Sequence, residues 1–126
     1  MNATKIAKPL FNIAGLYDGI LGLIFLIFGM HLFTWLDITP PNHVGYIQFP
    51  AALLIIFGLL FFGIAKDPKG RSYMILYGIL LKCSYCAIVF SHWIISGLPW
   101  IWKPFAIIDA VFLVLFIWMK SSLEKS

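Results

Sequence analysis

Charged side chains are scarce in this chain of 126 residues, of which 11% are Asp, Glu, Lys or Arg and 62% are hydrophobic. A soluble domain ordinarily carries about 25% charged residues. A surface with so little charge is not built to meet water over most of its area, which excludes an ordinary soluble globular domain. The composition therefore predicts an all-α integral membrane protein.

Familiar catalytic motifs are also missing. The sequence contains no G-x-G-x-x-G, P-loop, G-x-S-x-G or H-E-x-x-H pattern. Its basic residues do not alternate with aromatic residues as they do in proteins that bind single-stranded nucleic acids, so no nucleic-acid partner is expected. A non-enzymatic membrane protein is favoured over an enzyme, and any chemistry would take place among the helices or at their outer end.

Cysteine is limited to Cys83 and Cys86 in the stretch "CSYC". Redox-active C-x-x-C pairs lie at a helix N-terminus, where the helix dipole stabilises the thiolate. This pair instead falls in the middle of an apolar segment, where a disulfide between positions i and i+3 of a helix would be strained. We interpret both thiols as small packing groups, with a redox disulfide as the alternative, and expect no metal site because no Cys₂His₂ spacing is present.

Four apolar segments are long enough to cross a bilayer, which takes about 17–25 residues. They run from Leu10 to Leu36, from Phe49 to Ala65, from Tyr73 to Ile95 and from Pro104 to Met119. The first segment contains Asp18 and no small-residue cleavage site, so we interpret it as a retained span and not as a signal peptide. We predict one domain over residues 1–126, a four-helix bundle of two antiparallel helical hairpins. Pro9, Pro50 and Pro104 are expected near the first turns of their helices, where proline is tolerated.

The distribution of Lys and Arg predicts the orientation of the chain. Seven of the nine basic residues lie in the N-terminal tail, the 66–72 loop and the C-terminal tail, whereas the 37–48 loop has none and the 96–104 connection has Lys103. By the positive-inside rule, both termini lie in the cytoplasm and the protein belongs to the inner (cytoplasmic) membrane. Tryptophans near the segment ends fit an interfacial belt; they are Trp35, Trp93, Trp100, Trp102 and Trp118.

Three ionisable residues fall deep inside the predicted spans. At 1.5 Å per residue, Asp18, Lys82 and Asp109 lie roughly 12, 14 and 15 Å from the inner boundary. An unpaired charge at mid-bilayer costs about 2.5–3.5 kcal/mol on insertion scales. We therefore predict a buried Asp18–Lys82–Asp109 cluster, with the "GLYDG" glycines near Asp18 letting a neighbouring helix come close.

Two acids and one base leave a negative charge to balance. A proton on one aspartate would balance it, as would a bound cation or polar ligand. The other interpretation is a static cluster that fixes the register of the helices.

A pocket is a second candidate site. Tyr85 and Cys86 follow Lys82 on the same helical face, and His92 continues that stripe less closely. His31 and His92 lie at similar depth on different predicted helices, where imidazoles would suit a haem or a metal. A quinone is the other cofactor considered. The alternative is that each histidine hydrogen-bonds at a wet interface.

The layout resembles the DoxX-like group of small four-helix membrane proteins. The similar features are the chain length, the topology, a glycine-bearing first helix ("LYDGILGLIFLIFGMHLF"), and "FPAALLIIFGLLFFGIA" before a short basic turn. The resemblance implies a membrane component that in some members is linked to quinone-dependent sulfur oxidation. No catalytic residue is carried over from it, and Lys82 and "CSYC" are departures from the group.

Three functions follow from these features. The favoured one is a non-enzymatic accessory or assembly subunit of a membrane complex, with lipid and other membrane subunits, or further copies of this chain, as partners. The alternatives are a quinone- or haem-linked redox component and a proton or small-solute transporter that acts as an oligomer.

Overall fold

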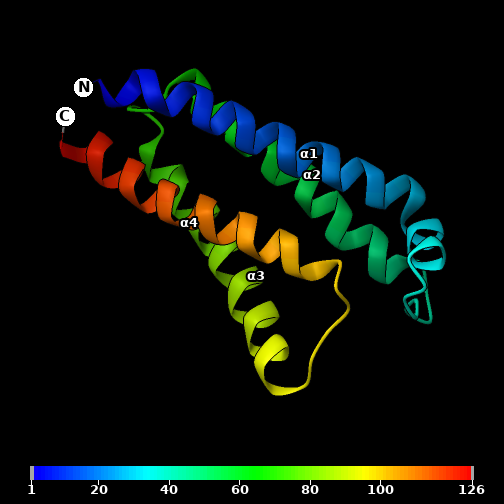
Figure 1. The fold of residues 1–126 in the computed structure, drawn as a ribbon. Helices are drawn as coiled ribbons and strands as arrows, with labels where there is room; N and C mark the ends of the chain where they lie inside the picture. Colours follow the sequence, from blue (N-terminus) through cyan, green and yellow to red (C-terminus); the bar gives the residue numbers. More distant parts are fainter. Residues whose placement is uncertain (1, 126) are drawn as a thin grey trace. The chain divides into compact units, whose positions relative to one another are not determined.

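A computed structural model describes residues 2–125, which form helices and no strand. The helices are α1 (Ala3–Trp35), α2 (Gly45–Lys66), the short 3₁₀ helix η1 (Ser72–Met74), α3 (Ile75–Ile95) and α4 (Trp102–Lys125), shown in Figure 1. The four α-helices are long and apolar enough to cross a membrane. The predicted all-α class and the four apolar spans are therefore confirmed.

The chain divides into two compact units. One contains residues 9–66, and the other contains the first turns of α1, through Lys8, together with everything from Asp67 onward. Because α1 runs through Pro9 without a break, it contributes to both units.

Glycines bring α1 and α2 together within the first of these units. A Cβ atom on Gly22 would lie 2.6 Å from the carbonyl oxygen of Ala51, and one on Gly15 would lie 2.9 Å from that of Gly58. Real side chains do not approach a backbone so closely, so only glycine permits this packing. Positions later in α1 meet positions earlier in α2, which means that the two helices run antiparallel.

The second unit is held by matching stripes on α3 and α4, which pack against each other. Buried positions on both helices are spaced three or four residues apart, as expected for one helical face. On α3 they are Ile75, Gly78, Lys82, Cys86 and Val89. On α4 they are Ala106, Asp109, Phe112, Phe116, Met119 and Leu123.

The connections that follow α1 and α3 each have a residue in the left-handed conformation as their second residue. Asp37 has φ of 57°, and the turn is closed by the Ile38 N–H, which donates to the Phe33 carbonyl at 2.9 Å. The Asp37 N–H donates to the Thr34 carbonyl at 3.2 Å, which completes a Schellman motif at the end of α1. Gly97, with φ of 72°, ends α3 in a related way. Asp is tolerated in this conformation better than most side chains, and Gly best of all.

The expected position of two prolines was wrong. α1 begins at Ala3 and α2 at Gly45, so Pro9 and Pro50 lie inside their helices, whereas Pro104 does lie in the first turn of α4. Hydropathy marks where the apolar part of a helix begins, but these helices continue into their polar flanks. Each internal proline removes one intrahelical hydrogen bond, which is tolerated near the end of a long helix more easily than at its centre.

Candidate functional site

A buried ion pair joins α3 to α4. Lys82 Nζ donates to Asp109 Oδ1 at 3.0 Å, and the two residues are 0% and 8% exposed. Both residues belong to the buried stripes of their helices, so the pair lies within the packed face of the hairpin. The predicted meeting of Lys82 with Asp109 is confirmed.

The ammonium also faces an aromatic ring. Lys82 Nζ lies 5.3 Å from the centroid of Phe112, one helical turn beyond Asp109. The electron-rich face of a ring attracts a cation, and the attraction is larger where water is absent. Phe112 in turn packs against Phe116 with centroids 5.7 Å apart. The cation therefore has a carboxylate and an apolar, electron-rich wall as neighbours.

Two more side chains of α3 donate hydrogen bonds to the backbone of α4. Tyr85 Oη lies 3.3 Å from the Trp102 carbonyl oxygen, and Cys86 Sγ lies 3.7 Å from that of Ala106. With Lys82, they form a row of three donors, in which the two later donors of α3 meet positions of α4 that precede Asp109. This row fixes both the antiparallel direction and the register of the two helices.

Lys103 adds a contact near the connection between α3 and α4. Its Nζ lies 5.0 Å from the centroid of the Trp93 ring, and Phe90 stacks on the same ring at 5.8 Å. Lys103 lies in the first turn of α4, where the helix dipole disfavours a cation, so the ring offers it a better environment. This contact ties the start of α4 to the last turns of α3.

Asp18 is buried as predicted, with 1% of its surface exposed. It lies on the part of α1 that belongs to the other compact unit. All three ionisable residues expected inside the spans are therefore buried, and the joining of Asp18 to the pair stays a prediction.

The pocket residues expected from the sequence have different surroundings. Tyr85 and Cys86 turn toward α4, whereas His92 is exposed on α3 and His31 is exposed on α1. His31 lies 6.1 Å from the ring of Trp35, one turn away. Within residues 2–125, no group of three or more His, Cys, Asp or Glu side chains is arranged to hold a metal ion.

The cysteines are both free thiols with different environments. Cys83 is exposed and Cys86 is buried against α4. The interpretation of Cys86 as a packing group accords with this position, and its contact with the α4 backbone adds a weak hydrogen bond that the spacing of the two cysteines did not reveal.

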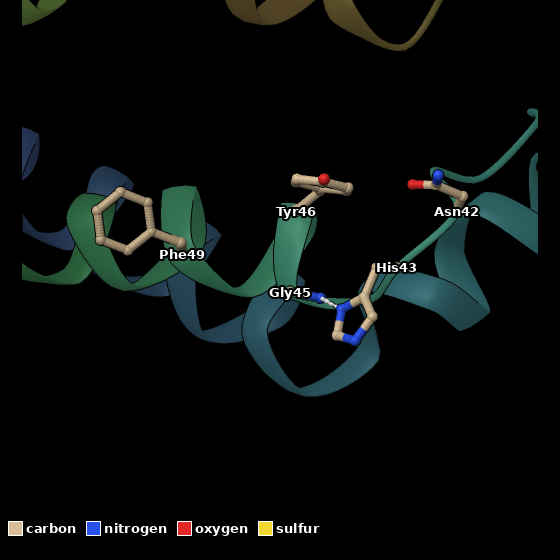
Figure 2. Close-up of a pocket in the computed structure, with 5 residues that line it drawn as sticks. All are labelled: Asn42, His43, Gly45, Tyr46 and Phe49. Atoms are coloured by element: carbon tan, nitrogen blue, oxygen red, sulfur yellow. Dashed lines mark hydrogen bonds between the residues drawn. The ribbon is translucent and has the colours of Figure 1, made fainter.

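An open hollow of about 590 Å³ lies at the start of α2, lined by Asn42, His43, Gly45, Tyr46 and Phe49 (Figure 2). His43 Nδ1 accepts the Gly45 N–H at 2.9 Å, and the imidazole meets the Tyr46 ring edge-on at 6.5 Å. The imidazole therefore caps one of the N–H groups that the first turn of a helix leaves without a partner. Sequence analysis did not find this hollow, because neither charge nor helical spacing links its residues.

Comparison with known proteins adds no family to these observations. No protein-family model matches the chain, and no curated protein or solved structure matches it significantly.

Proposed function

We propose that this chain is a non-enzymatic accessory or assembly subunit of a complex in the cytoplasmic membrane, with both termini in the cytoplasm. The observation that carries the proposal is the use made of the buried polar groups. Lys82, Asp109, Tyr85 and Cys86 all take part in hydrogen bonds that join α3 to α4. Such a row is suited to holding a hairpin in one register more than to turning over a substrate.

The outer surface of the helices supports the same proposal. Apolar side chains are exposed on all four spans, and Ile94 and Ile95 at the end of α3 are each 83% exposed. Lipid covers such surfaces in a bilayer, and another membrane subunit or a second copy would cover part of them in a complex. A rigid hairpin with an apolar exterior is a suitable element for such an assembly.

Gentle extraction in a lipid-retaining polymer, followed by mass spectrometry of everything that co-purifies, tests this function. A protein partner at constant stoichiometry is the expected result. The matched variant is Lys82→Met/Asp109→Leu, which removes both charges and keeps apolar volume, and it should retain the partner. A chain that purifies alone under every mild condition would contradict the proposal.

Orientation is tested separately. Reporters that are active on only one side of the membrane would be fused at the C-terminus and within the 66–72 and 96–101 segments. The first two should report the cytoplasm and the third the opposite side. Any other pattern would refute the proposed topology without bearing on the partner.

The charge balance of the buried residues favours a second candidate, a proton or small-solute transporter that acts as an oligomer. Asp18, Lys82 and Asp109 amount to two acids and one base, all buried, and we propose that Asp18 meets the pair and that a proton or a cation balances the charge. Liposomes containing the protein should then show a flux that Asp18→Asn and Lys82→Met abolish. A flux that is absent from the wild type, or unchanged in both variants, would eliminate the transporter.

The resemblance to DoxX-like proteins is retained as a proposal about the layout of the chain, and it adds a quinone- or haem-linked redox role to be tested. The purified protein would be examined for a Soret absorption band and for extractable quinone. Finding neither would count against this role, and finding either would replace the accessory function with a redox one.

A further inference from the structure

Six basic residues gather at one end of the unit that contains α3 and α4. They come from three separate segments: the first turns of α1, the turn before α3 and the last turns of α4. The six are Lys5, Lys8, Lys69, Arg71, Lys120 and Lys125. The same segments contain two acidic residues, so this basic end carries a surplus of four positive charges.

Both acidic residues are engaged locally. Asp67 Oδ1 accepts the Gly70 N–H at 3.1 Å within the turn before α3. Glu124 pairs with Lys120, one helical turn away on α4. The two carboxylates therefore shape the turn and the helix end, and the basic residues of these segments outnumber them by four.

The depth of the basic end follows from the buried ion pair. Lys120 follows Asp109 by eleven residues of α4, which is about 16 Å along the helix. On the other helix, α3 begins seven residues before Lys82, about 10 Å along its axis, and Arg71 lies in the turn that precedes η1 and α3. Half the hydrocarbon thickness of a bilayer is about 15 Å. If the pair lies at the midplane, Lys120 reaches the boundary where the headgroup phosphates begin, and Arg71 lies beyond the start of α3 in the turn that leads into it.

The helix ends that present these charges are packed through buried apolar residues. Ala7 and Met119 are fully buried, and Leu123 is 1% exposed, so the first turns of α1 and the last turns of α4 are packed and not frayed. In the turn before α3, the Arg71 N–H donates to the Asp67 carbonyl at 2.9 Å. The basic side chains are thus presented from fixed backbone positions, which lowers the entropic cost of binding a ligand.

We propose that this basic end binds the headgroup phosphates of anionic phospholipids in the cytoplasmic leaflet. Positive charge from three segments at the depth of the phosphates matches that ligand in charge and in position. A juxtamembrane basic residue contributes about 1 kcal/mol to the attraction of an anionic surface. A soluble acidic protein would meet the same charges from the water side, and the alignment with the phosphate level favours lipid.

The test measures lipid binding to the purified protein in mild detergent by native mass spectrometry, with phosphatidylglycerol and phosphatidylcholine offered in equal amounts. The wild type should retain phosphatidylglycerol preferentially. Lys5→Gln/Lys125→Gln should weaken that binding about five-fold per removed charge at low salt, which is the 1 kcal/mol contribution expressed as a ratio. At about 1 M salt the Debye length is 3 Å, and the preference should largely disappear.

Lys103→Gln is the matched control, because it removes a charge from the opposite end of the same unit and should leave the preference unchanged. Unfolding of all variants would be measured in parallel, so that a loss of lipid is not mistaken for a loss of fold. Equal retention of the two lipids by the wild type, or an equal loss in Lys103→Gln, would overturn the proposal. Displacement of the lipid by millimolar glycerol phosphate, or retention of an acidic soluble protein in its place, would overturn it as well.

Discussion

Replacing Lys82 by methionine leaves the Asp109 carboxylate inside the hairpin without its ammonium. Methionine keeps most of the volume and flexibility of the lysine stem, so the change is chiefly one of charge. Asp109→Leu does the opposite and leaves the Lys82 ammonium without the Asp109 carboxylate. Each single substitution should therefore destabilise the protein, and Lys82→Met/Asp109→Leu should restore most of the loss.

The magnitude follows from the geometry of the pair. At the observed 3.0 Å, two unit charges attract by about 5–6 kcal/mol if the effective dielectric constant is 20. Removing both charges from water costs several kcal/mol per ion, so the intact pair contributes little net stability. Removing one partner loses the attraction but keeps the burial cost of the other, and that imbalance amounts to about 3–5 kcal/mol. An insertion cost of about 2.5–3.5 kcal/mol for a lone charge at mid-bilayer supports the lower part of this range.

The assay is a double-mutant cycle on the free energy of unfolding, measured in lipid bicelles by trapping the unfolded state with a binding partner. A change of about 3 kcal/mol alters the unfolding equilibrium more than a hundred-fold, which such an assay resolves readily. The charge reversal Lys82→Asp/Asp109→Lys provides a second check, because it restores opposite charges at the same two positions.

Additive effects in the cycle would refute this reasoning. If the double variant loses the sum of the two single losses, the two charges do not interact, and the hairpin is held by apolar packing alone. A wild-type stability in both single variants would carry the same conclusion and would mean that each charge reaches water or headgroups by itself.

Three further substitutions test the packing of the helices. Gly22→Ala should cost about 1–3 kcal/mol in unfolding free energy, because its Cβ would lie 2.6 Å from a backbone oxygen of α2. The control Gly19→Ala, whose Cβ would have nothing within 4 Å, should be neutral or stabilising. Equal effects of the two substitutions would contradict the close approach of α1 and α2. Tyr85→Phe should cost about 0.6–1.7 kcal/mol through loss of its bond to α4, measured against the exposed control Tyr77→Phe, and a match between the two would show that the bond contributes nothing. Gly97→Ala should lower the free energy of unfolding by about 1–2 kcal/mol, because φ of 72° is unfavourable for a residue with a Cβ; an unchanged free energy would mean that the turn rearranges freely.

The parts of the structure that the sequence could predict are those that depend only on counts and spacings of residues along the chain. Counting residues along apolar segments identified four spans. Comparing depths predicted a cluster of Asp18, Lys82 and Asp109, of which the contact between Lys82 and Asp109 is confirmed. Helical spacing placed Tyr85 and Cys86 on the face that meets α4. Each inference needed only a rise per residue and a periodicity, both of which are fixed by the geometry of the α-helix.

The remaining features depend on where each helix begins and ends and on which main-chain atoms of two helices come close together. Pro9 and Pro50 were expected near helix starts, because hydropathy does not reveal the polar helical turns that precede them. The carbonyl partners of Tyr85 and Cys86 are main-chain atoms, which carry no signature in the sequence. The Schellman turn at Asp37 has a residue other than the usual glycine, so its left-handed conformation could not be anticipated from composition.

The chain separation within the buried pair bears on how the protein is made. Lys82 is synthesised 27 residues before Asp109, which at 5–20 residues per second is a delay of roughly 1–5 s. During that interval Asp109, whose carboxylate pairs with the lysine in the finished hairpin, has not yet been synthesised. We therefore expect stable insertion of α3 to depend on α4, with the two helices leaving the insertion machinery for the lipid together, as one hydrogen-bonded pair.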